Sequence, residues 1–592
     1  MSDWTFEQLL KNGCDLLAEK RLGEAEVTLK KALARHPESS LANHFTGLVL
    51  ALRMQLEQAM PLLNKAVEIE PDNVQFRYNL ATTSYQLKLY DQALFHFKRL
   101  LSIKPDHLGA LINCGGVYNI LGYPSEAEKI LKSAIRKKPA QAMAHINLGN
   151  ALEEQGRIDE AMGAYRQAIA IEPESAYAHS NLLLASCYSA RLSQDKRYQM
   201  HLQWERYVRR GAGDFPNAHA ENIYDRPLRI GYISPDFRLH SVAYFLEPLL
   251  QFHTKSLFEI YCYSDVAVPD DVTKRLQTHV HKWRIIAGAT DTQVADQVYN
   301  DRIDILVDLA GHSGKNRLGV FMMKPAAIQV TYLGYPATTG LSTMDYRLTD
   351  EYADPAGQEI YHTEELYRLP ASFLCYRPPE IYPKVAESPC RQNGYITFGS
   401  FNNLPKISED VIRLWADILT RIPSSRMVIK TRQTRDPVVC KRVGDSFAAF
   451  GIEPARIQFL GHVSNVKDHL CCYNKIDIAL DTFPYNGTTT TFEALWMGVP
   501  VVSLRGDHHA SRVGYSIMSN LGLESLVAET PEKYSRIATF LSEDISRLGI
   551  LKKSLRGVLS GSVLCDSRGF VQKVELAYRE MIEKKYSRKT SS

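Results

Sequence analysis

The feature that most constrains the fold is a period of 34 residues in the first third of the chain. Prolines recur at one position of this period and alanines at another. The prolines are Pro37, Pro71, Pro105, Pro139 and Pro173, and the alanines are Ala25, Ala59, Ala93, Ala127 and Ala161. Small residues let paired helices approach closely, and proline ends the second helix of each pair. The period therefore predicts an α-solenoid of five helix–turn–helix repeats over residues 1–175.

A stack of such repeats has a concave groove, because one repeat cannot bury its apolar face alone and stacking completes the core. We expect this groove to bind extended acceptor polypeptides. Asparagines on or near the first helices of the repeats could bond a peptide backbone; they are Asn113, Asn147, Asn150 and Asn181. The alternative is an array that only spaces domains or joins two copies of the chain as a homodimer. Residues 176–225 are expected to form capping helices and a linker.

The rest of the chain alternates short apolar runs with helical patterns, which is typical of doubly wound parallel sheets. The expected strands of the first lobe are residues 228–233, 258–263, 303–307 and 327–332, and those of the second are residues 395–398, 426–430, 457–460, 476–480 and 500–504. The sequence thus predicts two Rossmann-like α/β lobes, an N-terminal catalytic lobe over residues 226–390 and a nucleotide-sugar-binding lobe over residues 391–580. Residues 581–592 are expected to be a disordered tail.

Polar and glycine-rich motifs follow several of these strands. They are residues 234–240, 308–312, 333–340, 399–406 and 482–493. Ligands of open α/β sheets bind at the carboxyl ends of the strands. We therefore expect one composite site in a cleft between the lobes.

The motif after the strand at residues 476–480 contains Gly487, then four consecutive threonines that begin with Thr488, and then Glu493. A helix N-terminus carries unpaired N–H groups and partial positive charge, so this helix start is a natural seat for a diphosphate. Glu493 could accept the hydroxyl protons of a ribose. Lys406, which follows a Gly-Ser-Phe-Asn-Asn turn, could reach the cleft and neutralise a phosphate.

Histidines in the strand-following loops could supply acid–base chemistry or hold a base ring. His240 and His312 could each accept a proton from an attacking hydroxyl, with Asp236 and Asp308 as second choices. A donor phosphate oxygen or a chain of waters could serve instead. His469 could stack on a nucleotide base. The adjacent His508 and His509 cannot easily face one ion, so we expect no metal.

The composition favours a protein that stays in the cytoplasm and binds neither nucleic acid nor membrane. The net charge is +4 and the basic residues are not gathered into blocks. The ten cysteines are scattered without zinc-like spacing, which is typical of free thiols in a reducing compartment. The first residues lack the basic and apolar segments of a signal peptide. No apolar run approaches the roughly 20 residues needed to span a bilayer.

Taken together, the repeats and motifs resemble the O-linked N-acetylglucosamine transferase family, and most closely its SPINDLY branch. The repeats resemble the tetratricopeptide type. The matching motifs are residues 234–237, 240–245, 304–312, 329–336, 339–340, 345–347, 398–406, 480–491 and 498–500. The resemblance implies a glycosyltransferase-B fold and metal-independent, inverting transfer of a sugar to Ser or Thr of proteins.

The resemblance also implies roles for individual residues. His240 and Lys406 would be catalytic, Lys406 also binding the diphosphate. The other residues expected to bind the nucleotide sugar are Asn403, His469, Gly487, Thr488, Thr489, Thr490 and Glu493. Those expected on the acceptor or sugar side are Asp236, His312, Tyr335 and Pro336.

Two departures from the animal enzymes leave the donor open. Pro405 stands where they have Tyr, and Glu493 stands where they have Asp. The animal enzymes use UDP-N-acetylglucosamine, which is the donor that we expect here. Plant SPINDLY proteins are similar to this chain and use GDP-fucose, which makes protein O-fucosylation the alternative. A non-catalytic repeat scaffold is a second alternative.

Overall fold

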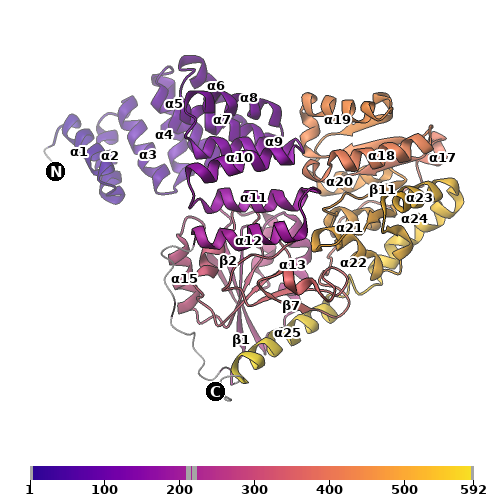
Figure 1. Ribbon diagram of the computed structural model, residues 1–592. Helices are drawn as coiled ribbons and strands as arrows, with labels where there is room; N and C mark the ends of the chain where they lie inside the picture. The colour runs from indigo at the N-terminus through magenta and orange to yellow at the C-terminus, as the bar shows by residue number, and fades with distance from the viewer. Residues whose placement is uncertain (1–3, 209–214, 216–222, 224, 588–592) are drawn as a thin grey trace. The chain divides into compact units, whose positions relative to one another are not determined.

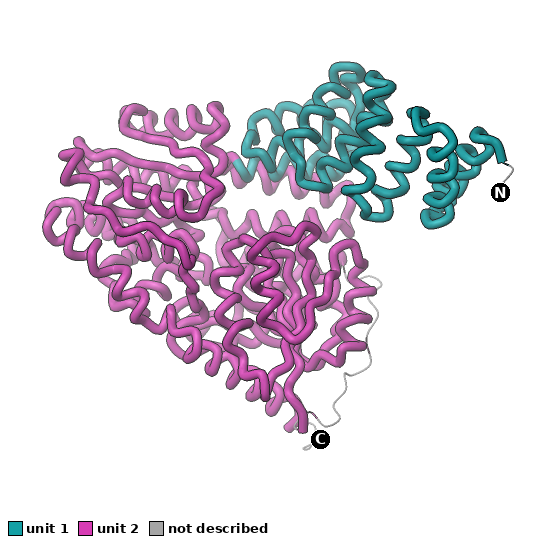
Figure 2. Tube along the Cα trace, turned by 180° about the vertical axis from the view of Figure 1, so that it is seen from behind, with its two compact units in different colours: residues 1–154 teal, residues 155–592 magenta. Residues whose placement is uncertain are grey.

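The computed structural model describes residues 4–208, 215, 223 and 225–587. The chain divides into two compact units, Met1–Glu154 and Gln155–Ser592, which Figure 2 shows in teal and magenta. The first unit is entirely helical in its described part. The second holds further helices and two parallel sheets. Each unit is described by itself below.

The helices of the first unit follow the sequence period. They are α1 (Phe6–Ala18), α2 (Leu22–Arg35), α3 (Ser40–Leu52), α4 (Leu56–Ile69), α5 (Val74–Gln86), α6 (Tyr90–Ile103), α7 (Leu108–Leu121), α8 (Pro124–Lys137) and α9 (Ala142–Glu154). The small residues allow close packing within a pair: a Cβ on Gly13 would lie 2.6 Å from Leu29, and one on Gly115 would lie 2.5 Å from Leu131. A Cβ at either position would therefore displace the facing leucine, and glycine lets that leucine pack closely.

Three more helices open the second unit: α10 (Ile158–Ile171), α11 (Ala176–Tyr188) and α12 (Gln194–Val208). Helices α11 and α12 are built into the first α/β lobe. Leu183 and Trp204 belong to the same buried apolar cluster as Ile233 and Ile303. The indole N–H of Trp204 donates to the carbonyl of Thr339 at 2.7 Å. The expected capping helices are therefore structural parts of this lobe, and most of the expected linker to residue 225 lies outside the described residues.

The first lobe contains a seven-stranded sheet in the described part of the chain, with the order β3-β2-β1-β4-β5-β6-β7. Every pairing is parallel. The strands are β1 (Leu228–Ser234), β2 (Phe258–Ser264), β3 (Lys282–Ile285), β4 (Ile305–Asp308), β5 (Ile328–Thr331), β6 (Tyr346–Thr349) and β7 (Glu365–Arg368). Its helices include α13 (Ser241–Phe252), α14 (Asp271–Gln277), α15 (Asp291–Asn300) and α16 (Leu318–Met322). The strand order reverses between β1 and β4, which is where open α/β sheets bind ligands.

The second lobe repeats this plan over a six-stranded sheet, again counted in the described residues, with the order β10-β9-β8-β11-β12-β13. The strands are β8 (Thr397–Ser400), β9 (Arg426–Lys430), β10 (Ile457–Leu460), β11 (Ile478–Leu480), β12 (Val501–Leu504) and β13 (Val527–Ala528). All pair in parallel. The helices include α17 (Cys390–Asn393), α18 (Glu409–Arg421), α19 (Pro437–Ala449), α20 (Val466–Cys471), α21 (Thr489–Trp496), α22 (Val513–Ser519), α23 (Pro531–Glu543) and α24 (Ile545–Ser560). The expected α-solenoid and two doubly wound lobes are confirmed.

The last helix, α25 (Ser567–Ser587), returns to the first lobe, where Figure 1 shows it in yellow near β1 and β7. Its Glu575 accepts from the hydroxyl of Thr254 at 2.9 Å, and its Tyr578 lies 3.2 Å from Tyr232, oxygen to oxygen. The expectation of a disordered tail from residue 581 is wrong for residues 581–587. They continue α25, and Met581 and Ile582 are buried because they complete the first lobe's core. Residues 588–592 lie outside the described residues.

None of the helices in the described residues is both long enough and apolar enough to cross a bilayer.

Candidate active site

The ends of β8 and β11 meet at the strand-order reversal of the second lobe, around the buried carboxylate of Asp481. One oxygen accepts the amide N–H groups of Thr482 at 2.8 Å and Gly487 at 2.7 Å, and the other accepts the hydroxyl of Ser503 at 2.8 Å. Burial raises the pKa of Asp481 to about 6, although these hydrogen bonds oppose the shift. Asp481 therefore holds the loop that leads into α21.

Lys406 reaches this loop from the short turn Leu404–Lys406. Its Nζ donates to the carbonyl of Asn486 at 2.8 Å and lies 3.9 Å from the ring centroid of Tyr485. Burial lowers the pKa of Lys406 to about 8, while Asp481 nearby acts in the opposite direction. The lysine is thus a cation in a poorly hydrated position beside the start of α21.

The threonine run begins α21 with unused donors. Thr488 occupies the cap position, but it makes no side-chain cap bond. Thr490 donates to Asn402 at 3.0 Å, and Thr491 donates to the carbonyl of Gly487 at 3.1 Å. Within the described chain, no hydrogen bond is recorded for the hydroxyls of Thr488 and Thr489. The first amides of α21 and these two hydroxyls can therefore serve an anion.

Glu493 ends a chain of polar contacts. Its Oε2 accepts the hydroxyl of Tyr473 at 2.9 Å and lies 2.9 Å from Nε2 of His469, whose Nδ1 lies 2.6 Å from Nζ of Lys430. Among the described residues, none forms a hydrogen bond with Oε1 of Glu493. The residue Glu493 is 9% exposed. One carboxylate oxygen is therefore held in place and the other is available to a ligand hydroxyl.

In the first lobe, His240 caps α13 directly after the loop that follows β1. Its Nδ1 lies 3.4 Å from the amide nitrogen of Val242 and 3.5 Å from a carboxylate oxygen of Asp236. Burial lowers the pKa of His240 below its ordinary value, although Asp236 opposes the shift. The imidazole is therefore neutral near pH 7.

The two lobes bring α13 and α21 together. The ring of Phe245 lies 5.3 Å from that of Phe492, centroid to centroid. A groove of about 610 Å³ opens beside this contact, lined by Leu239 and Tyr244 from the first lobe and by Val466 and Lys467 from the second. The loop of His240 and the helix of His469 therefore border one space.

The expected acceptor-side residues His312 and Tyr335 lie in a buried cluster instead of on this groove. His312 contacts the Thr339 carbonyl at 2.8 Å through Nε2 and the Ser180 hydroxyl at 3.1 Å through Nδ1. Burial holds the pKa of His312 well below its ordinary value. Pro336 is buried nearby, and Asn403 is exposed but accepts the Gln433 amide at 3.0 Å. With both ring nitrogens occupied, His312 anchors α11 in this structure.

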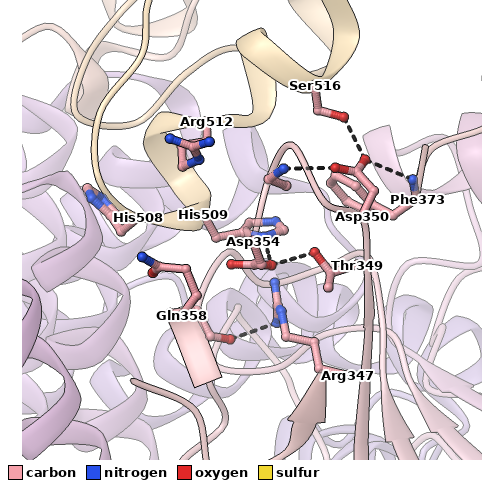
Figure 3. A network of polar contacts seen from close by, with 12 residues as sticks. Arg347, Thr349, Asp350, Asp354, Gln358, Phe373, His508, His509, Arg512 and Ser516 are labelled. Carbon is pink, nitrogen blue, oxygen red and sulfur yellow. Dashed lines mark hydrogen bonds and ion pairs between the residues drawn. The ribbon is translucent and has the colours of Figure 1, made fainter. Parts of the chain in front are cut away.

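Figure 3 shows a second contact between the lobes, and this one is polar. Asp350 and Asp354 follow β6, and they meet the segment of the second lobe that leads into α22. Asp354 pairs with Nδ1 of His509 at 2.6 Å, and Asp350 accepts the hydroxyl of Ser516 at 2.6 Å. Burial alone would raise the pKa of Asp354, but His509 outweighs it and holds the pKa far below its usual range. The lobes are thus joined by buried, charge-assisted bonds.

Replacement of His509 by Ala should destabilise the second unit by about 3 kcal/mol, because the buried carboxylate of Asp354 loses its hydrogen-bond donor. Urea unfolding followed by far-UV circular dichroism measures the loss. The exposed pair Arg505–Glu529 offers a control, since Glu529→Gln should cost less than about 1 kcal/mol. Equal losses in the two variants would contradict the assignment of His509 to the lobe contact.

Nucleotide affinity should fall as the pH rises through about 8. The pKa of Lys406 is about 8 in the free protein, so its charge is present below that pH and is lost above it. Calorimetric titration with a nucleoside diphosphate between pH 6.5 and 9 checks this. Lys406→Arg should flatten the decline, because arginine stays charged throughout. A wild-type affinity that stays constant across pH 8 would show that the lysine charge does not bind the ligand.

Several residues of the site were not predicted from the sequence. Asn402, rather than its neighbour Asn403, contacts Thr490, and Lys430 and Tyr473 hold the His469–Glu493 pair. Lys430 ends a predicted strand, which could have indicated it. Tyr473 precedes a strand, so no position rule would have found it.

Two facing parallel-sheet lobes with a cation and an open helix start at the switch point define the class of glycosyltransferase-B-like nucleotide-sugar enzymes. The family model described as Glycosyl transferase family 41 matches residues 175–392 and 390–574, and a Tetratricopeptide repeat model matches residues 121–176. The chain belongs to glycosyl transferase family 41. The resemblance to the O-linked N-acetylglucosamine transferase and SPINDLY family is confirmed.

Individual relatives agree with this family. The chain is 44% identical over 408 residues to the Oryza sativa subsp. japonica protein described as "Probable UDP-N-acetylglucosamine--peptide N-acetylglucosaminyltransferase SPINDLY", covering 67% of this chain and 44% of that one. An Arabidopsis thaliana protein of the same description is 41% identical, covering 68% and 44%. A Thermobaculum terrenum O-GlcNAc transferase mutant superposes with a TM-score of 0.82 at 35% identity, covering 86% of this chain and 98% of that one. The chain spans less than half the length of these plant relatives.

Proposed function

We propose that this protein transfers N-acetylglucosamine from UDP-N-acetylglucosamine to Ser or Thr hydroxyls of proteins, with inversion and without a metal. The observation that carries the proposal is the juxtaposition of Lys406 with the unsatisfied start of α21. A buried cation beside free helix amides suits a diphosphate. The names of the relatives, each an N-acetylglucosamine transferase, favour this donor over GDP-fucose.

The proposed reaction forms a bond between the acceptor oxygen and the anomeric carbon while the bond to the diphosphate breaks. Attack comes from the face opposite the nucleotide, which inverts the anomeric centre. Negative charge grows on the leaving diphosphate, where Lys406, the first amides of α21 and the hydroxyl of Thr489 stabilise it. Glu493 would hold the ribose through Oε1, and His469 would lie beside the base.

We assign the acceptor's proton to His240. This role needs the tautomer in which Nδ1 carries the proton and donates it to Asp236, in place of accepting the Val242 amide, since only then is Nε2 bare and able to act as the base. His240→Ala should lower kcat by about 100-fold or more and leave the KM for the donor nearly unchanged. Steady-state kinetics check this, with His281→Ala as a control, since His281 is exposed just before β3 and accepts the amide of Ile260. A kcat within about twofold of wild type would shift the base role to a phosphate oxygen or a water.

The repeats would supply the acceptor. We propose that the groove of the helical array binds extended segments of proteins and passes them to the cleft. The partners are therefore acceptor proteins and a nucleotide sugar, in the cytoplasm. Pairing of two copies through the repeats stays a proposal of the same kind.

A thermal-shift panel of UDP-N-acetylglucosamine, GDP-fucose, UDP and GDP tests the donor. A ligand at 100 times its Kd adds about 2.7 kcal/mol of stability, which is a measurable rise in Tm. We expect the uridine compounds to raise the Tm and the guanosine compounds to have little effect. The reverse order would replace the donor with GDP-fucose, and no response to any of the four would contradict the proposed function.

A further inference from the structure

A ring stack links helix α11 to the lysine of the donor site. Tyr188, the last residue of α11, stacks on Tyr485 with ring centroids 5.1 Å apart and planes inclined by 19°. Nζ of Lys406 lies 3.9 Å from the centroid of the same Tyr485 ring. The ring of Tyr485 therefore contacts both Tyr188 and Lys406.

A second contact, between the turn before α10 and the backbone around Lys406, involves Gly156. Gly156 has a φ of +74°, and a Cβ on it would lie 3.2 Å from the Leu404 carbonyl and 3.5 Å from that of Ile407. These two carbonyls flank Lys406. Arg442 of α19 also donates to the carbonyl of Gln155, next to Gly156. The turn before α10 thus supports the backbone of Lys406 while α11 supports its ammonium through Tyr485.

We propose that Tyr188 is a positioning residue for Lys406 and acts through the ring of Tyr485. The inference rests on the proposed function, in which Lys406 binds the diphosphate. An ammonium over an aromatic face is held by the ring's quadrupole, and the ring also excludes water from it. Tyr485 can do this only while its ring is held in place, and the stack with Tyr188 holds it. Helix α11 would therefore help to set the charge state of the donor site.

The ionisation of Lys406 gives a test that needs no nucleotide. Lys406 would be acylated by acetic anhydride over a range of pH, and the modified peptide quantified by mass spectrometry. In the wild type we expect a midpoint near 8. In Tyr188→Ala, water enters beside the ammonium and the midpoint should rise by about one pH unit toward that of an ordinary lysine. A purely structural role would change the folded fraction and leave the midpoint where it was.

Two matched variants serve as controls. Tyr188→Phe keeps the stacked ring and should keep the wild-type midpoint. Tyr177→Ala removes a tyrosine that is 44% exposed at the other end of the same helix, and it should also keep that midpoint. A Tyr188→Ala midpoint equal to that of Tyr177→Ala would overturn the inference. So would a Tyr188→Phe midpoint displaced as far as that of Tyr188→Ala.

Nucleotide binding then separates this inference from the proposed function. Tyr188→Ala should bind UDP about 5- to 10-fold more weakly than the wild type and Tyr188→Phe, as measured by calorimetry at pH 7. Unchanged UDP affinity in Tyr188→Ala, in a wild type that binds UDP, would overturn the positioning role alone. A wild type that binds neither UDP nor GDP would refute the proposed function, whereas the acylation midpoints would still decide whether Tyr188 acts on Lys406.

Discussion

Lys406→Ala should reduce sugar transfer by about 100- to 1,000-fold while the protein stays folded. Without Lys406, the negative charge that grows on the leaving diphosphate lacks the ammonium that stabilises it. A preorganised donor of this kind stabilises the transition state by about 3–4 kcal/mol. Initial rates with saturating donor and acceptor measure the loss. The fold should persist, because the side chain makes a single hydrogen bond, to the carbonyl of Asn486.

The matched control is Lys441→Ala, which removes an exposed lysine of α19 that pairs only with Asp445 at the surface. Its rate should equal that of the wild type. Lys406→Arg should recover part of the activity, since it keeps the charge but not the geometry. A Lys406→Ala rate within about tenfold of wild type would remove the lysine from the mechanism.

Asp481→Ala should cost both stability and activity. The substitution leaves the amides of Thr482 and Gly487 and the hydroxyl of Ser503 without their buried acceptor, a loss of about 3–5 kcal/mol. Because Gly487 leads into α21, the helix start should lose its shape, and donor binding should fall with it. Urea unfolding and calorimetric titration with UDP report the two effects.

Asp481→Asn gives a graded comparison, because the amide oxygen can still accept one set of these bonds. We expect a smaller loss, about 1–2 kcal/mol, and partial donor binding. If Asp481→Ala were as stable as the wild type, the carboxylate would not be what holds the loop.

The sequence predicted the repeats well because each residue type performs one local task that recurs. Gly13 and Gly115 admit a leucine from the facing helix, and proline ends each pair. Most buried strands were equally readable from their apolar runs. Two buried strands were missed, because β6 (Tyr346–Thr349) alternates polar and apolar residues and β13 (Val527–Ala528) has only two residues. The edge strands β3 and β7 were missed, since Lys282–Ile285 and Glu365–Arg368 are charged and partly exposed and so do not form apolar runs.

In the site, the motifs that act locally were predictable and the contacts between distant segments were not. The threonine run and Lys406 each stand out beside a strand. The stack of Tyr188 on Tyr485 joins residues almost 300 positions apart, and no pattern in either segment announces it. The sequence correctly predicts that His312 follows a strand. It does not show that α11 and α12 cover the residue. The ring of Trp204 in α12 lies 4.6 Å from that of His312, centroid to centroid.

The most direct test of the central claim is the mass of an acceptor protein incubated with UDP-N-acetylglucosamine and this enzyme. Intact-mass spectrometry would follow the acceptor, and fragmentation would locate the modified residue. We predict the gain of one or more N-acetylhexosamine groups on Ser or Thr with the wild type and none with Lys406→Ala. An acceptor that gains no sugar from the wild type, or that gains it equally from Lys406→Ala, would contradict the proposed function and its site.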